Sequence, residues 1–259
     1  MDRTRRLVAV AGFVAALFAT TGAATAASAG AHFGHFTCRG GSLGSPKILK
    51  SGTYRSLRVV GVCAVPTGGK VRVRGNVLVK RHATLNAVSQ STFNVGGNVV
   101  VSDDAIAGLG CSDEAGCANL TNDHIGGNLT ANGATAVVVQ QEFIGGNATI
   151  VGGGGNMNCA STVFFGGPYF DTIEDSSVGG NIWIQQIHSC WFGMFRLHVG
   201  GNVSVRGNRM GDPDGNEIAT NTIGGNLACF NNVPHAQVGD SQGAPNVVAG
   251  KKLGECANL

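Results

Sequence analysis

Short stretches of alternating apolar and polar residues recur along the chain, and one stretch in each repeat follows a glycine-asparagine pair. The repeated phrase is an apolar residue, a Gly-Asn or Gly-Gly-Asn step, and then alternating apolar residues. It occurs seven times, at 73–79, 95–101, 125–129, 144–150, 178–184, 199–205 and 223–227. Successive asparagines of the phrase are 22, 30, 19, 34, 21 and 24 residues apart. An alternation of period two predicts strands, and a repeat of about 20 residues predicts a solenoid.

One repeat unit is clear between Asn76 and Asn98. It contains three short alternating runs, Val77–Val79, Ala83–Ala87 and Phe93–Val95, which are separated by polar or glycine corners. A propeller blade needs about 40 residues or more, so this unit is too short for one. The pattern predicts an all-β chain that folds as a single-stranded right-handed parallel β-helix of about 20–24 residues per coil, with capped ends and two or more loop insertions. Seven to nine coils, stacked about 4.8 Å apart, would form a rod roughly 35–45 Å long.

The glycine and the asparagine of the phrase have separate expected roles. Glycine adopts backbone conformations that other residues avoid, so we expect it to form a sharp corner at the same place in each coil. Asparagine at one position of stacked coils is expected to form an amide ladder, in which each side chain bonds the next.

The chain divides into four expected parts. Residues 1–29 have the pattern of a secretory signal peptide, with Arg3, Arg5 and Arg6 before an apolar run too short to span a bilayer. Small residues then give cleavage sites near 26 or 29. We expect an N-terminal cap at 30–70, the β-helix repeat at 71–226 and a C-terminal cap at 227–259.

Eight cysteines lie after the predicted signal peptide, and an even number in an exported chain predicts disulfides. They allow 105 pairings, of which we favour the pairing of neighbours in sequence. The sequence contains no C-x-x-C or C-x-x-H cluster of the kind that binds zinc, so a zinc site is not expected. The favoured pairs are Cys38–Cys63, Cys111–Cys117, Cys159–Cys190 and Cys229–Cys256.

The net charge of the chain is too small to attract a strongly charged partner. Removing residues 1–26 lowers Lys+Arg from 18 to 15 and Asp+Glu from 15 to 14, so the net charge falls from +3 to +1. A near-neutral chain without an apparent Lys/Arg block argues against nucleic acid or an anionic membrane as partner. No later segment approaches the length of a membrane-spanning helix, so membrane insertion is not expected.

Acidic residues provide one candidate metal site. Asp212, Asp214 and Glu217 lie in a D-x-D-G fragment that resembles part of a calcium loop, although the loop spacing and its bidentate glutamate at position 12 are missing. The alternative is a solvated acidic turn. Calcium is therefore the one cofactor that the sequence suggests. No pair of carboxyl groups is forced by its spacing into a glycosidase arrangement, and no catalytic residue is assigned.

Aromatic residues gather in two places. Phe164, Phe165 and Tyr169 lie in the longest insertion, whereas Trp191 and Phe192 directly follow Cys190. A Cys159–Cys190 bridge would bring the two groups together. They would form either a stacking platform for sugars or a satellite core beneath the insertion.

The chain resembles a group of secreted Gly-Gly-Asn-repeat, β-helix-like proteins of high-GC Gram-positive bacteria. The resemblance covers nearly the whole chain after the signal peptide. It implies export and a β-helix-like fold, and it carries no activity. The resembling segments are Gly52-Thr53-Tyr54 with Leu57-Arg58-Val59, Gly75-Asn76-Val77 with Ala83-Thr84-Leu85, 108–111, and 243–250.

These features favour a secreted, non-enzymatic structural or binding protein of the extracellular space or cell surface, with polysaccharide or the cell envelope as partner. The alternative is a polysaccharide-active enzyme, a lyase or hydrolase, on the same scaffold. The sequence leaves the ligand and the oligomeric state open.

Overall fold

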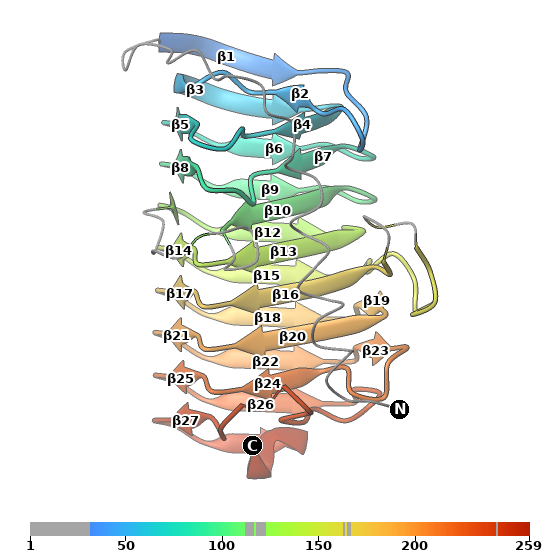
Figure 1. Cartoon of the computed structure of the whole chain (residues 1–259). Coiled ribbons are helices and arrows are strands. Elements are labelled where there is room, and N and C mark those ends of the chain that lie inside the picture. Colours follow the sequence, from blue (N-terminus) through green and yellow to red (C-terminus); the bar gives the residue numbers. More distant parts are fainter. Residues whose placement is uncertain (1–31, 112–116, 118–122, 163, 165–166, 242) are drawn as a thin grey trace.

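The fold is an all-β parallel solenoid of about ten turns (Figure 1). The computed structural model describes residues 32–111, 117, 123–162, 164, 167–241 and 243–259. The predicted signal peptide and Phe165 lie outside these residues. Each turn of the chain runs through three faces before the next turn begins. Strands of successive turns stack in parallel and in register on each face.

The first face precedes the Gly-Asn corner of each turn and the second face follows it; together with β1 and β3 at the N-terminal end, their strands form the 18-stranded sheet. The first-face strands are β5 (Lys70–Val73), β8 (Thr92–Val95), β11 (His124–Ile125), β14 (Phe143–Ile144), β17 (Ser177–Val178), β21 (His198–Val199), β25 (Thr222–Ile223) and β27 (Val247–Val248). The second-face strands are β6 (Val77–Val79), β9 (Val99–Val101), β12 (Leu129–Asn132), β15 (Ala148–Val151), β18 (Ile182–Gln185), β22 (Val203–Arg206), β26 (Leu227–Phe230) and β28 (Lys252–Gly254).

The third face is an eight-stranded sheet. Its strands are β2 (Lys47–Ile48), β4 (Val62–Ala64), β7 (Thr84–Asn86), β10 (Ile106–Gly110), β13 (Ala136–Gln140), β16 (Phe170–Glu174), β20 (Trp191–Phe195) and β24 (Glu217–Ala219). A short pair, β19 (His188–Ser189) with β23 (Arg209–Met210), lies between the second and third faces.

The solenoid register extends into both predicted caps. The strand β3 (Gly52–Val59) pairs with β5 and β6 and so spans the first two faces, while β1 (His32–Cys38) pairs above it. At the other end β27 and β28 continue the stack, followed by the 3-10 helix η2 (Glu255–Asn258). The three strands expected between Asn76 and Asn98 are confirmed as β6, β7 and β8. The turn count exceeds the expected seven to nine because the turns of β1 and β3 and the last turn, with β27 and β28, all lack the Gly-Asn phrase.

A continuous core fills the inside of the solenoid. From β5 to β25, the apolar residue that ends each first-face strand stacks on its counterpart in the next turn, and none of these side chains is more than 4% exposed. Because each turn buries its apolar side only against its neighbours, stability depends on the stack as a whole. One such column is Val73, Val95, Ile125, Ile144, Val178, Val199 and Ile223.

The asparagine ladder is confirmed. The Oδ1 of each asparagine accepts a hydrogen bond of 2.8 Å from the backbone N–H of the next asparagine, from Asn76 through Asn226. Up to Asn202 the side-chain Nδ2 also donates to the Oδ1 above it, at 3.2–3.3 Å. The ladder therefore satisfies a backbone donor at a corner where the strand hydrogen bonding is interrupted.

The expected reason for the glycines of this corner is wrong. None of the Gly-Gly pairs adopts a positive φ; what requires glycine is the close approach of neighbouring turns. A Cβ on Gly96 would lie 2.5 Å from the carbonyl oxygen of Arg74, and one on Gly127 would lie 2.5 Å from the Oδ1 of Asn98. Glycine is present because the ladder and the stacked backbone leave no space for a side chain.

Left-handed backbone occurs instead at the other two corners of the turn. After the second face it is shared by glycines such as Gly133 and Gly207 and by other residues, whereas after four third-face strands it occurs without glycine. The four residues that follow third-face strands β13, β16, β20 and β24 have φ angles of 50–61°. Non-glycine residues rarely adopt this region, so the stacked position holds the conformation against residue preference. These residues are Gln141, Asp175, Arg196 and Thr220.

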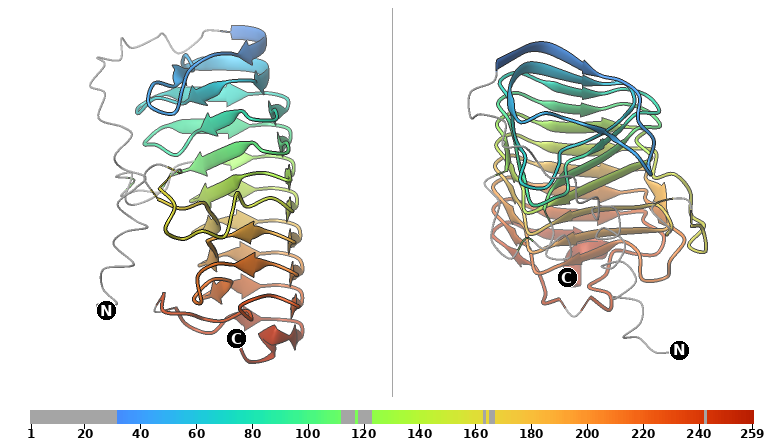
Figure 2. Two further views of the ribbon diagram at one scale, coloured as in Figure 1. Left: turned by 90° about the vertical axis from the view of Figure 1, so that its right-hand side faces the viewer. Right: turned by 45° about the horizontal axis from the view of Figure 1, so that its top comes forward.

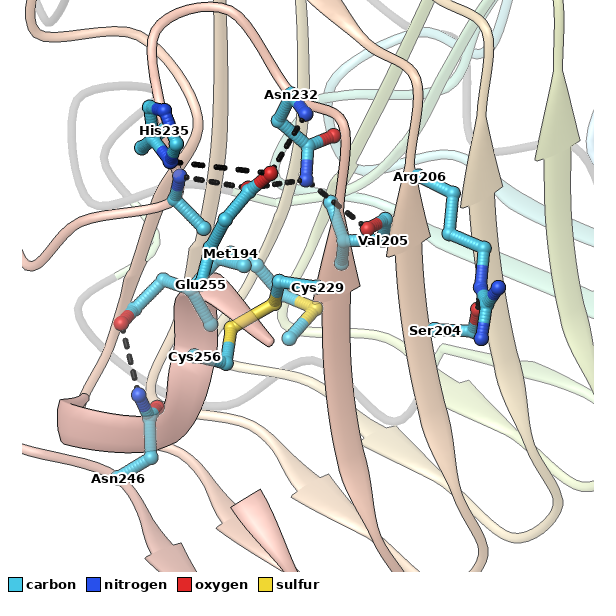
Figure 3. The surroundings of a disulfide bond; sticks show 12 residues. Met194, Ser204, Val205, Arg206, Cys229, Asn232, His235, Asn246, Glu255 and Cys256 are labelled. Atoms are coloured by element: carbon cyan, nitrogen blue, oxygen red, sulfur yellow. Dashed lines mark hydrogen bonds and ion pairs between the residues drawn. A yellow bond between two sulfur atoms is a disulfide. The ribbon is translucent and has the colours of Figure 1, made fainter. Parts of the chain in front are cut away.

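All eight cysteines are paired as the sequence favoured. The Cα–Cα distances are 6.4 Å for Cys38–Cys63, 5.9 Å for Cys111–Cys117, 5.0 Å for Cys159–Cys190 and 5.2 Å for Cys229–Cys256. Figure 3 shows the last of these beside the Glu255 carboxylate, which accepts hydrogen bonds from the backbone N–H and the Nδ2 of Asn232 at 2.9 and 2.7 Å. The C-terminal turn is thus closed by a disulfide and by a carboxylate placed where the next turn would begin.

Candidate functional site

The third face is the irregular side of the molecule. Segment 152–169 enters it at β16, and segment 211–216 enters it at β24. Figure 1 shows the yellow loop of residues 152–162 projecting from the solenoid near the β19–β23 pair, and Figure 2 shows the even stack of first- and second-face strands. The Cys159–Cys190 disulfide ties the longer insertion to the start of β20. Residues without repeat counterparts therefore collect over one face.

Part of the aromatic group forms a satellite core, as the structural alternative predicted. The ring of Phe164 lies 5.5 Å from the rings of both Tyr169 and Phe170. These rings cover a second apolar cluster on the outer side of the third face, together with Val88, Ala136, Val138 and Ile106. Phe164 is only 5% exposed, so it is a packing residue.

Trp191 and Phe195 form a separate pair beside this cluster. Their rings are stacked with 5.8 Å between centroids and 20° between planes, and Trp191 remains partly exposed. Trp191 is the register partner of Phe170 on the neighbouring strand, so the two aromatic groups are adjacent. We call the outer side chains Tyr169, Phe170, Trp191 and Phe195 the aromatic strip.

Phe192 does not belong to this surface. It alternates with Trp191 along β20 and points into the main core, where it is fully buried. Its assignment as a stacking residue is wrong, because the period-two alternation of a strand sends neighbouring side chains to opposite faces.

Glu217 lies against the aromatic strip. Its Oε1 accepts a 3.0 Å hydrogen bond from the indole Nε1 of Trp191, and the residue is 3% exposed. Burial raises the pKa of Glu217 to about 7; the Trp191 indole opposes this, while Asp240 and Asp214 raise the pKa further. The carboxyl group therefore changes its protonation state near neutral pH. Its hydrogen bond with Trp191 fixes the orientation of the indole.

The structure does not gather the candidate calcium ligands. Within the residues that it describes, Asp212, Asp214 and Glu217 form no group whose ligand atoms lie within 4.8 Å of one another. The Oδ1 of Asp212 instead accepts the backbone N–H of Asp214 at 3.1 Å, and Glu217 bonds the indole. The described residues do bring Asp212 within this distance of Cys159 and Cys190. These two sulfur atoms are joined in a disulfide and are therefore not available as thiolate ligands.

An ion-pair network borders the aromatic strip. The guanidinium of Arg196 donates to both carboxylate oxygens of Asp175, at 2.5 and 2.7 Å, and to the Oε2 of Glu174 at 3.1 Å. The hydroxyl of Thr172 donates to the other oxygen of Glu174 at 2.6 Å. Arg196 also lies 5.8 Å from the centroid of the Phe195 ring. These contacts hold charged groups next to an aromatic surface, an arrangement suited to a ligand with both hydroxyls and apolar faces.

A second buried carboxyl lies beneath the strip. Asp171 is 1% exposed, and its Oδ1 accepts the backbone N–H of Val137 at 2.8 Å. Burial raises the pKa of Asp171 to about 7, against the effect of hydrogen bonds from Val137 and Ser189. The sequence contained no signal for the burial of Asp171.

The other tryptophan was not singled out by the sequence. Trp183 lies on β18, in register with Thr149 and Ser204 on the neighbouring strands, and is partly exposed on the second face. It stands alone on a surface without insertions, whereas Trp191 has aromatic and charged neighbours.

Comparison with protein-family models, curated proteins and solved structures yields no match. Among the described residues, no helix has the length and apolar character needed to cross a membrane.

Proposed function

We propose that this chain is a secreted, non-enzymatic binding protein whose ligand is a polysaccharide of the extracellular space or cell surface. The observation that carries the proposal is the partly exposed, stacked Trp191 next to the Arg196 network. Sugars present apolar ring faces that pack on aromatic side chains, and hydroxyls that bond carboxylates and guanidinium groups. The stacked tryptophan is held by Phe195 and Glu217, so little order has to be gained on binding.

Export is the second part of the proposal. The pattern of residues 1–29 is that of a signal peptide, and four disulfides suit an oxidising compartment. A disulfide-tied solenoid would also withstand the proteases and dilution of an extracellular setting.

A polysaccharide-active enzyme is the second candidate, and the carboxyl of Glu217 is the observation that favours it. A carboxyl with a pKa near 7 can act as a general acid. However, Glu217 is 3% exposed, and backbone of the 237–239 segment packs directly against its side chain. A glycosidic oxygen would have to displace that segment to reach the carboxyl. Binding without cleavage is therefore the stronger proposal.

The test is retention of the purified mature protein on a panel of insoluble polysaccharides and bacterial walls, with reducing ends and unsaturated products assayed in the same tubes. We expect retention without product. The variant Trp191→Ala should weaken retention by about tenfold, the value of one aromatic stacking contact. Product release by the wild-type protein would instead establish the enzyme.

Trp183→Ala is the matched control, because it removes the same side chain from a different face. It should leave retention unchanged. Loss of retention with Trp183→Ala but not with Trp191→Ala would move the binding surface to the second face and contradict the site proposed.

A further inference from the structure

The charges of this chain are segregated along the solenoid axis, which the near-neutral total conceals. Residues 32–102 contain ten Lys or Arg and no Asp or Glu, whereas residues 103–259 contain five Lys or Arg and fourteen Asp or Glu. The expectation of a chain without a basic block is therefore wrong: the basic residues are spread in sequence, and stacking of the turns brings them together. The ten are Arg39, Lys47, Lys50, Arg55, Arg58, Lys70, Arg72, Arg74, Lys80 and Arg81.

These residues occupy the first turns, drawn in blue and cyan in Figure 1. On the first face, Lys70, Arg72 and Arg74 alternate with buried Val71 and Val73, so all three side chains point outward and are exposed. The backbone of Arg74 pairs with β3 next to Arg55. The stack thus places Arg55 and Arg74 of successive turns side by side. We call the first turns, with their ten basic residues, the basic end.

The positive charge of the basic end is largely uncompensated. Within the described residues, Arg81 is the one basic residue of this end that forms a salt bridge, with Asp103 and Asp104 of the following turn. Arg55, Arg72 and Arg74 form none there. Like charges at such short spacing repel one another, so the arrangement is unfavourable until an anion occupies it.

A groove opens on the basic end at the first Gly-Asn corner. Its volume is about 900 Å³, and its charged or ionisable lining side chains are Arg55, Arg74, His32 and His35. The ring of Phe33 and the hydroxyl of Thr53 complete the wall, and no carboxylate lines it. The groove is therefore rich in hydrogen-bond donors and poor in acidic acceptors.

The asparagine ladder ends in this groove. Asn76 is the first asparagine of the ladder, is exposed, and lines the groove. Its Oδ1 accepts from Asn98, but in the part of the chain that the structure describes its Nδ2 donates to no residue. The corner thus offers an amide donor beside two guanidinium groups, a set that fits the oxygens of a carboxylate, sulfate or phosphate.

We propose that the groove lined by Arg55, Arg74 and Asn76 binds an anionic polysaccharide whose acidic groups also contact the adjacent basic residues Arg72 and Lys70. Arg55 and Arg74 belong to neighbouring turns, which are stacked about 4.8 Å apart. Arg72 and Lys70 continue from Arg74 at every second position of the same strand, about 7 Å apart. A polymer with repeated acidic groups can engage several of these positions at once, whereas a single small anion cannot. The surface is separate from the aromatic strip, so one molecule can hold an acidic polymer at its N-terminal end and a sugar surface on its third face.

The experiment measures affinity of the full mature protein for soluble polygalacturonate, with neutral dextran and duplex DNA as separate arms. We expect binding to polygalacturonate that weakens as salt rises, because the contacts are between exposed charges, and no binding to dextran. The double variant Arg55→Gln/Arg74→Gln should weaken the binding by about tenfold or more. Its fold is verified by circular dichroism and by its melting temperature.

Two further variants separate charge at the groove from charge in general. Arg55→Lys/Arg74→Lys keeps the charge and should retain most of the affinity. Arg209→Gln/Lys251→Gln removes two exposed positive charges from the other end and should have no effect.

Equal affinity of the Arg55→Gln/Arg74→Gln protein and the wild-type protein for polygalacturonate would overturn the site. Equal binding of dextran would overturn the role of charge. Tighter binding of duplex DNA than of polygalacturonate at the same salt concentration would overturn the ligand class. Retention on insoluble polysaccharide through Trp191 is a separate readout, so either proposal can fail without the other.

Discussion

The Gly-Gly-Asn corner and the third face are built in opposite ways. At the corner each turn repeats the same two contacts, an asparagine hydrogen bond of 2.8 Å and a glycine that lets two backbones approach. On the third face no two turns carry the same outer side chains, and Trp191 and Glu217 have no counterpart in the neighbouring turns. Asp171 points inward beneath this surface, in register with Phe192. The corner is repeated scaffold, and the third face has the variation in which a specific site can arise.

This difference has a consequence for stability. A contact that is repeated in every turn adds to the stability of the whole stack. A buried carboxyl on the third face instead lowers the free energy of unfolding locally when it ionises. Asp171 and Glu217 both have pKa values raised to about 7 by burial. Each also satisfies a donor, since Asp171 accepts the backbone N–H of Val137 and Glu217 accepts the indole Nε1 of Trp191. An apolar replacement would leave that donor without its partner.

The largest effect is expected at the corner. In Gly201→Ala the new Cβ would lie 2.5 Å from the Oδ1 of Asn181 and 2.8 Å from the carbonyl oxygen of Gly180. Since one neighbour is backbone, the turns must separate locally, and we expect a loss of about 3 kcal/mol in the free energy of unfolding. Chemical denaturation of the oxidised protein measures this loss.

Gly34→Ala is the matched control for this substitution. Gly34 lies in β1, and a Cβ there would meet no atom within 4 Å, so the free energy of unfolding should change little. If Gly201→Ala behaved like Gly34→Ala, the close approach of turns would not explain the glycines, and the contrast between corner and third face would lose its structural basis.

The second prediction concerns the third face and pH. The native pKa of Asp171 is raised from 3.8 to about 7, so its contribution to stability is fully present below pH 4 and is lost as pH rises through 7. Between pH 5 and pH 8 this amounts to about 2 kcal/mol. Asp171→Asn should therefore flatten the fall in unfolding free energy across that range.

Asp103→Asn is the control, because Asp103 is an exposed carboxyl on another part of the molecule. Its variant should keep the wild-type pH dependence. A wild-type protein that is equally stable at pH 5 and pH 8 would show that Asp171 is ionised at little cost in the folded state, and the third face would then resemble the corner energetically.

The sequence predicted the repeated parts well, and the reason is physical. A phrase that recurs in every turn reports its own environment several times, so the strands, the asparagine ladder and the core column could be inferred together. Unique residues give no such repetition. Neither the burial of Glu217 under the 237–239 segment nor the left-handed backbone of Arg196 has any local signal.

The basic end was missed for another reason. Net charge is a sum over the chain, whereas stacking sorts residues by turn; Arg55 and Arg74 are 19 positions apart in sequence yet line one groove. The aromatic strip was partly predicted, because the clustering of aromatic residues was visible. The alternation that buries Phe192 beside Trp191 becomes certain only once the strand register is known.

The smallest effect is expected for one step of the ladder. Asn147→Ala removes the Oδ1 that accepts from the backbone N–H of Asn181 at 2.8 Å, and it removes the Nδ2 that donates to Asn128. The corner is partly open to water, which replaces some of these bonds, so a loss of about 1 kcal/mol in unfolding free energy is expected. Asn132→Ala, at an exposed position of β12 outside the ladder, should cost less. If Asn147→Ala destabilised the protein as much as Gly201→Ala, the side-chain ladder rather than the packing of turns would dominate the corner. If it cost nothing, the asparagines would serve to set the register of the turns, and the stability of the corner would come from the backbone alone.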